Sequence, residues 1–225
     1  MKAKRSGCGE IETEVKNQKT VQIRPPNFNM AEFEITGTAP LVIHRFSEKL
    51  KVVMTDKMET GKASGNKKNR EPKSTDATYE ASKYRSVNGW EGFHAGAIRN
   101  AMISACRLVD FKMTLAKMSI FVIADGKDEC EPQIPLVRIY GKSIKQTDIG
   151  RTSTKQPYVT VRAAYHEWKA KIKIRWDADQ FTLNDVTNLL SRVGMQVGIC
   201  EGRPDSKNSA GMGWGTFEIE RSKAV

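Results

Sequence analysis

The sequence predicts a mixed α+β fold, an antiparallel sheet with helices on one face, plus basic insertions and a β-hairpin. Segments with apolar residues at every second position alternate along the chain with segments whose apolar residues recur at helical spacing. The 225 residues include 39% apolar residues, enough to bury one sizeable core. The formal net charge of +11 points to a polyanionic partner, first a nucleic acid and second an anionic membrane surface.

The composition argues against several classes of protein. No run of eighteen apolar residues occurs, so we expect neither a membrane-spanning helix nor a membrane partner. The charged N-terminus lacks a following apolar stretch, unlike a secretory signal. Four cysteines and three histidines are scattered without zinc-site spacing, so we expect no metal and no cofactor. Free thiols fit a reducing, cytoplasmic environment.

The N-terminal part predicts an arm followed by the start of a single domain, residues 30–225. Residues 1–29 are polar and contain Pro25-Pro26, which predicts a mobile arm. Met30–Thr36 alternates as a strand, and Ser47 suits the cap of a helix that runs to about Glu59.

Residues 61–75 form a basic insertion with five basic residues, one acidic residue and no large apolar side chain. This composition predicts a flexible segment. It is either a solvated loop or a basic flap that lies on a phosphate backbone. In the second case the contacts would come from Lys67, Lys68 and Arg70.

The middle of the chain predicts helices and further strands. We expect a short helix at Tyr79–Val87 and a longer one at His94–Val109, whose first turn is made of small residues and leaves its N-terminus accessible to an anion. Ser119–Ala124 reads as a buried strand, and Gln133–Tyr140 and Ser143–Asp148 as two more.

A cationic hairpin is predicted next. Tyr158–Tyr165 and Trp168–Trp176 both alternate, and a short turn at His166-Glu167 would join them. In the second strand, period-two geometry places four cations on one face: Lys169, Lys171, Lys173 and Arg175. Between Ile134 and Arg175 there are ten Lys and Arg residues against two acids. Such a row needs either full solvation, as on a lysine-protected edge strand, or an anion.

The C-terminal part predicts a helix, a glycine-rich loop and a last strand. The helix runs from about Leu183 to Val197, with Thr182 and Asp185 as a capping box. The loop, Val193–Phe217, holds six glycines together with Arg203 and Lys207, and Gly215–Glu220 alternates after it. Exposed backbone N–H groups and two cations suit an anion, although a long loop of no function is the alternative.

This order of elements fits a ferredoxin-like (RRM-like) sheet with insertions. Three stretches resemble the RAMP superfamily, the RNA-binding proteins of CRISPR effector complexes. Gly92–Ala101 is similar to the start of the first RAMP helix, and Gly202-Arg203 with Gly211–Phe217 to the C-terminal glycine-rich loop. Ile35–His44 resembles the first strand of the backbone-type subunits, which polymerise along a guide RNA.

The resemblance implies a non-catalytic protein that binds single-stranded RNA, or single-stranded DNA, largely without sequence specificity. It also implies two kinds of protein partner, other copies of the chain along the strand and CRISPR effector subunits. A free-standing relative of these subunits, carried by a phage or mobile element, would fit the same resemblance. The residues expected to bind nucleic acid are Arg99, Arg162, Lys169, Lys171, Lys173, Arg175, Arg203, Lys207, Lys67, Lys68 and Arg70, with the loop glycines Gly202, Gly211, Gly213 and Gly215.

Two other functions stay open. A metal-independent endoribonuclease would need a base near the 2′-hydroxyl, for which His44, His94 and His166 are the available histidines. None has a recognisable partner, so we assign no catalytic residue. An interaction protein that mimics or blocks a CRISPR effector subunit would instead dock its basic surface on an acidic protein.

Overall fold

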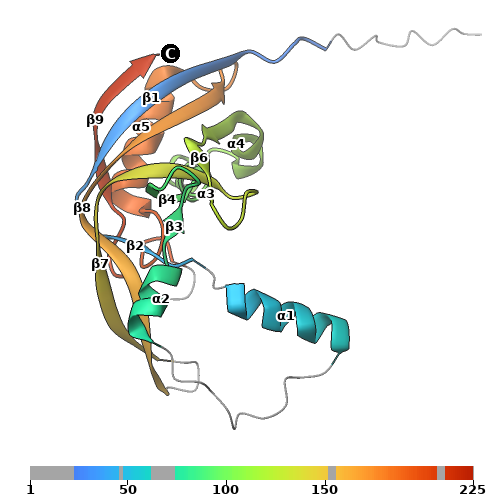
Figure 1. Cartoon of the computed structure of the whole chain (residues 1–225). Helices are drawn as coiled ribbons and strands as arrows, with labels where there is room; N and C mark the ends of the chain where they lie inside the picture. Colours follow the sequence, from blue (N-terminus) through green and yellow to red (C-terminus); the bar gives the residue numbers. More distant parts are fainter. Residues whose placement is uncertain (1–22, 46–47, 62–73, 152–155, 207–210, 225) are drawn as a thin grey trace, which may run out of the picture.

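The computed structural model describes residues 23–45, 48–61, 74–151, 156–206 and 211–224. A curled antiparallel sheet forms one layer, and the helices α3, α4 and α5 lie on its concave side (Figure 1). The predicted mixed α+β class with an antiparallel sheet is therefore confirmed. Predictions on Lys67, Lys68, Arg70, Lys207 and residues 1–22 lie outside the described residues.

The main path of the sheet runs β3-β4-β7-β8-β1-β9, while β2 and β5 pair with β8 and β6 pairs with β7. The strands are β1 (Phe28–Gly37), β2 (Leu41–Ile43), β3 (Tyr84–Arg85), β4 (Glu91–His94), β5 (Ile120–Ile123), β6 (Gly126–Lys127), β7 (Pro135–Arg151), β8 (Pro157–Asp177) and β9 (Phe217–Ala224). The two strands predicted between Gln133 and Asp148 are wrong, because β7 runs through both.

The hairpin predicted around His166-Glu167 is also wrong. Residues Pro157–Asp177 form one continuous strand, and its hairpin partner is β7. Gly141 pairs with Trp168 and Ser143 with Tyr165, so His166 and Glu167 together face a single residue of β7. This is a β-bulge. The extra residue shifts the pleat. The face of β8 that is buried therefore carries odd-numbered residues up to Tyr165 and even-numbered residues from Trp168 onward.

The described helices are α1 (Glu48–Thr60), α2 (Thr75–Ala81), α3 (Gly96–Ala105), α4 (Met113–Ser119) and α5 (Leu183–Arg192). A 3₁₀ turn follows α3 at Cys106–Val109, and a π-helical turn follows α5 at Val193–Val197. The predicted capping box is confirmed, since Thr182 Oγ1 accepts from Asp185 N at 3.2 Å and Asp185 Oδ2 accepts from Thr182 N at 2.9 Å. The helix predicted at Tyr79–Val87 is wrong in its bounds, because α2 ends at Ala81 and β3 follows.

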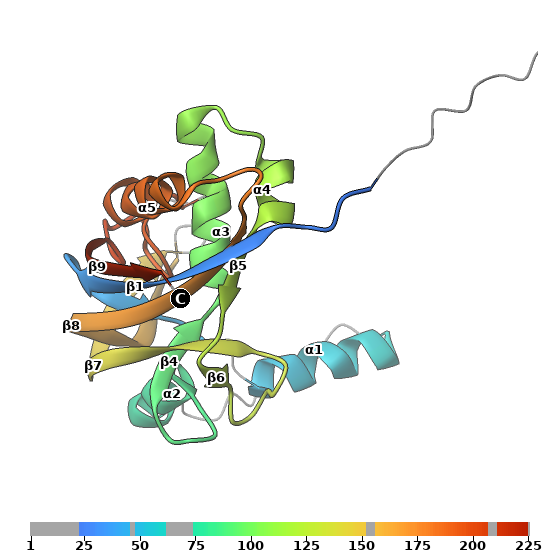
Figure 2. The ribbon, with the colours of Figure 1, turned by 90° about the horizontal axis from the view of Figure 1, so that it is seen from above.

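The core lies between the concave side of the sheet and the helices (Figure 2). Ala31, Phe33 and Ile35 of β1 point into it, and so do alternate residues of β8 from Trp168 to Trp176. Trp168 is nearly fully buried, and its indole Nε1 donates to the Ala39 carbonyl at 2.9 Å. A Cβ on Gly37 would lie 2.0 Å from this Nε1, so glycine is required where β1 crosses the indole.

Candidate nucleic-acid interface

The face of the sheet opposite the helices is here called the convex face, and no described helix covers it (Figure 1). Beside Glu220 of β9, charged and aromatic side chains of four further strands lie on it. They are Phe28, Glu32 and Glu34 of β1, Phe121 of β5, Arg138 and Tyr140 of β7, and Lys169, Lys171, Lys173 and Arg175 of β8. The predicted cation row is therefore confirmed as one face of one strand.

The lysines of this row meet carboxylates of the same chain. Lys169 Nζ lies 2.7 Å from Glu220 Oε1 on β9, and Lys171 Nζ lies 2.9 Å from Glu34 Oε1. Lys173 Nζ lies between Glu32 at 3.9 Å and Asp125 at 3.8 Å. The lysine side chains stay 40–58% exposed, so water and ions reach each pair. Exposed ion pairs of this kind add little stability, and another anion can readily take the place of the carboxylate.

Arg175 differs from the lysines, because it has no carboxylate partner among the described residues. Its guanidinium lies over two phenyl rings instead, 5.0 Å from the ring centroid of Phe28 and 5.2 Å from that of Phe121. The two rings meet edge to face, with centroids 5.9 Å apart. Phe121 is the direct neighbour of Arg175 in the sheet. The charge of Arg175 is thus held in place without being neutralised.

Arg99, at the start of α3, reaches the same phenyl ring. Its guanidinium carbon lies 5.4 Å from the ring centroid of Phe121. Its Nε donates to the Ile120 carbonyl at 2.9 Å, and its Nη2 donates to the Lys117 carbonyl. The structure therefore brings together Arg99 and Arg175, and it gives Arg99 a role in tying α3 to α4 and β5. A direct contact of Arg99 with nucleic acid stays a prediction.

A second cation–aromatic pair lies on β7. The Arg138 guanidinium is 5.1 Å from the ring centroid of Tyr140, and Tyr140 pairs with Lys169. The tyrosine is 44% exposed. Sequence reasoning missed both residues as site residues, although the alternation of β7 carries the signal: the neighbour Ile139 is buried and the two flanking residues point outward.

The glycine-rich loop folds back on itself through its own backbone. The Gly202 carbonyl accepts from Met212 N at 2.7 Å and from Trp214 N at 3.2 Å, and Gly215 N donates to the Pro40 carbonyl at 2.9 Å. A Cβ on Gly215, whose φ is +70°, would lie 2.0 Å from the Ile199 carbonyl oxygen.

The four loop glycines therefore differ in what they permit. Positive φ is shared by Gly202, Gly211, Gly213 and Gly215. A Cβ on Gly202 would meet the Trp214 ring at 2.4 Å, and one on Gly211 would meet the Arg203 carbonyl oxygen at 2.4 Å. Gly213 alone among them faces open space within the described part of the chain. Packing explains three of these glycines, and Gly213 is the position left for an external contact.

Arg162 and Arg203 lie near this loop and away from the row of four cations. Arg162 forms an ion pair with Glu201 at 3.3 Å, and its side chain is only 14% exposed. Arg203 Nη1 donates to the Cys200 carbonyl at 3.1 Å. The predicted binding residues thus divide into two groups, one on the convex face and one beside the loop.

The histidines show no catalytic arrangement among the described residues. His94 Nδ1 accepts from Gly96 N at 2.8 Å, which is a local structural role at the start of α3, and His166 is exposed in the bulge of β8. His44 is exposed, yet desolvation by the surrounding protein, together with the positive charge of Arg162, lowers its pKa, while Glu201 acts in the opposite direction. Within the described ranges, no group of three or more His, Cys, Asp and Glu residues suits a metal ion.

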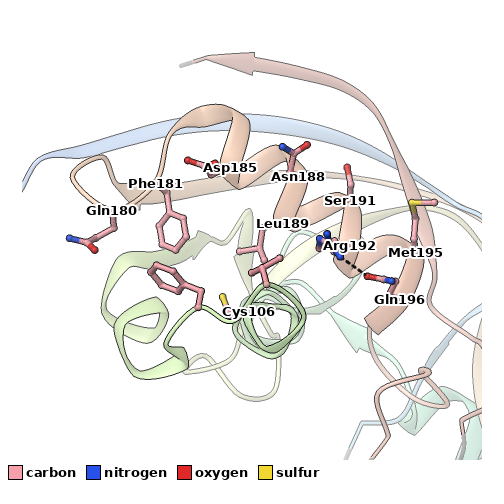
Figure 3. Close-up of a pocket in the computed structure, with 12 residues that line it drawn as sticks. Cys106, Gln180, Phe181, Asp185, Asn188, Leu189, Ser191, Arg192, Met195 and Gln196 are labelled. Atoms are coloured by element: carbon pink, nitrogen blue, oxygen red, sulfur yellow. Dashed lines mark hydrogen bonds between the residues drawn. The ribbon is translucent and has the colours of Figure 1, made fainter.

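A groove of about 790 Å³ lies on the other side of the molecule, between α3 with its 3₁₀ turn and α5 (Figure 3). Phe111 and Phe181 form part of its floor, with ring centroids 4.8 Å apart. Arg192 and Gln196 lie at its rim, joined by a hydrogen bond of 3.4 Å. None of the residues predicted to bind nucleic acid lines this groove.

Comparison with known proteins gives distant structural likenesses alone. No family model and no curated protein matches the chain. The fold is similar to a chain in the cryo-EM structure of the type III-B Cmr-β complex bound to cognate target RNA, with a TM-score of 0.44 and 10% sequence identity. The match covers 88% of this chain and 61% of that one, so this chain spans less than two thirds of its length. No described helix is long and apolar enough to cross a membrane.

Proposed function

We propose that this chain is a non-catalytic protein that binds single-stranded nucleic acid, RNA in preference to DNA, with little dependence on base sequence. We further propose a ferredoxin-like (RRM-like) topology of the RAMP type for a single domain that begins with β1 at Phe28 rather than at Met30, preceded by an N-terminal arm. The partners would be the strand, further copies of the chain along it and CRISPR effector subunits.

One observation carries the proposal: the row of four cations lies on a sheet face that no described helix covers. Cations that contact the phosphates of a strand release the counterions bound to it, which gives salt-dependent affinity without base specificity. The lysine–carboxylate pairs fit this role, because phosphate can replace an exposed carboxylate at little cost. Contacts to phosphates repeat with every nucleotide, so a strand longer than one site accommodates several copies.

The experiment measures binding of the full chain, purified at high salt, to a single-stranded RNA of roughly thirty nucleotides and to the DNA of the same sequence. Fluorescence anisotropy gives the affinity and its salt dependence, and size-exclusion chromatography with light scattering gives the mass of the complex. We expect salt-reversible growth to several copies per strand, with RNA bound more tightly.

A charge-matched pair of triple variants locates the site. Replacing the three lysines of the row by Gln removes three positive charges from the convex face. Replacing Lys112, Lys127 and Arg192 by Gln removes three elsewhere. With about 0.7 ion released per phosphate contact, the first variant loses about 2 units of salt slope and the second loses much less. A chain that binds neither strand at moderate salt, or two variants of equal effect, would overturn the proposal.

A further inference from the structure

We propose that Arg175, Phe28 and Phe121 form a stacking site for one unpaired nucleobase at the end of the convex face. We call these three residues the stacking cluster. The inference rests on the proposed function, because it assigns a specific role to one part of the same face.

The stacking cluster combines one exposed planar cation with two phenyl rings. The guanidinium lies 5.0 Å and 5.2 Å from the two ring centroids, and the rings meet at an interplanar angle of 75°. Phe28 is 39% exposed, although its position is paired with β8 in the sheet. One face of the cluster therefore remains open to solvent.

The cluster is held from three sides before any ligand arrives. Phe28 belongs to β1 and Phe121 to β5, which pair with opposite edges of β8, so the two rings come from either side of the strand that carries Arg175. Phe121 is further contacted by Arg99, itself fixed by its bonds to the Ile120 and Lys117 carbonyls. A site whose side chains are already ordered loses little conformational entropy on binding.

The chemistry selects an unpaired base as the occupant. Bases stack on aromatic rings and on guanidinium planes, and such stacking tolerates any base because each has a π-face. Arg175 has no carboxylate partner among the described residues, so its positive charge is free for the phosphate or the electron-rich face of the base. Lys173, two residues earlier on the same face, would hold a neighbouring phosphate. A duplex keeps its bases stacked inside the helix, so the site favours a single strand.

The test separates stacking from charge by comparing a single-stranded RNA with inorganic polyphosphate, an anion of similar charge density without bases. Phe28→Ala should weaken RNA binding by about 5- to 150-fold, the range for losing one stacked base. It should leave polyphosphate binding and the salt slope unchanged, because no charge is removed. Phe28→Tyr keeps a ring and should bind RNA like the original chain. Arg175→Lys keeps the charge and should lose affinity for RNA more than for polyphosphate.

Thermal unfolding checks each variant, and Phe28→Leu, which keeps apolar packing without a ring face, replaces Phe28→Ala if the latter does not fold. Equal losses for both polyanions, or no loss for RNA, would overturn the stacking site while leaving the proposed function in place. If the original chain binds neither polyanion, the proposed function fails and the stacking site fails with it.

Discussion

Lys171 Nζ lies 2.9 Å from the carboxylate of Glu34 on the adjacent strand, so the central cation of the convex face is paired within its own chain. The hydrogen bond and the negative charge of Glu34 raise the pKa of Lys171. Any phosphate that binds here competes with Glu34 for the same ammonium group. The carboxylates on β1 and β9 therefore limit the affinity of this face for polyanions.

The first prediction follows from this competition. Glu34→Gln removes the competing charge but leaves Lys171 in place, so the affinity for single-stranded RNA should rise. The salt slope should steepen only slightly, because Lys171 contacts the strand in both chains. Fluorescence anisotropy over a salt series measures both. Glu129→Gln changes the net charge equally at an exposed position off the convex face, and should alter neither by as much. A Glu34 variant with unchanged or weaker binding would show that Lys171 does not contact the strand.

The second prediction concerns two glycines of the loop with similar backbone conformation. Gly213 and Gly215 have φ of +74° and +70°, but only a Cβ on Gly215 collides with a neighbouring backbone. Gly213→Ala should lower the free energy of unfolding by about 1–2 kcal/mol, the cost of left-handed backbone. Gly215→Ala should cost a further 1–3 kcal/mol or so from overpacking. Urea unfolding measures both, and equal losses would contradict the packing described for Gly215.

The third prediction is a pH dependence that originates at His44. Because the pKa of this imidazole is lowered in the folded chain, the unfolded chain binds more protons as the pH falls through the ordinary value of 6.5. The stabilising contribution is therefore complete above about pH 7 and is lost as the pH falls below 6.5 towards the lowered pKa.

The Tm should thus fall less between about pH 7.5 and about pH 5.5 in His44→Gln than in the original chain. His166→Gln, at an exposed position of the bulge, serves as the control. Its Tm should fall between the two pH values by as much as that of the original chain. Identical pH profiles for the original chain and the His44 variant would contradict the prediction.

The fourth prediction concerns Arg99 as a structural residue. Arg99→Ala removes the donor to two backbone carbonyls and the contact with Phe121, and should lower the free energy of unfolding by about 2–3 kcal/mol. Arg107→Ala, which breaks an exposed ion pair with Asp205 one turn beyond α3, should cost at most about 1 kcal/mol. Urea unfolding compares the two. If Arg99→Ala weakens RNA binding without loss of stability, Arg99 serves the binding of the strand, either directly or through Phe121.

Much of the fold was accessible from local patterns in the sequence. The capping box at Thr182 and Asp185 and the outward row from Lys169 to Arg175 follow from spacing alone. The bulge at His166-Glu167 could not be predicted from spacing, because two consecutive exposed polar residues suit a hairpin turn as well as a bulge. Only the pairing of Gly141 with Trp168 and of Ser143 with Tyr165 distinguishes the two.

Sequence spacing predicted the row of cations on the convex face but not the side chains beside it, and the reason is physical. Sequence spacing places side chains on a face of one strand, but it does not say which strands lie beside it. The acids Glu32 and Glu34 come from a strand more than a hundred positions earlier in the chain, and so does Phe28. Both the neutralisation of the lysines and the rings beneath Arg175 arise from these long-range pairings, which local periodicity does not encode.

The position of β8 in the sheet has a consequence for synthesis of the chain. Among the described strands, β1 pairs with β8 and β9 alone, so within this part of the chain it has no partner until Lys169–Asp177 leave the ribosome. Translation proceeds from the N-terminus at a limited rate, and an unpaired strand edge promotes aggregation during that interval. A nascent chain that stalls before β8 therefore exposes Phe33 and Ile35 together with an open edge, and becomes a target for chaperones or proteases.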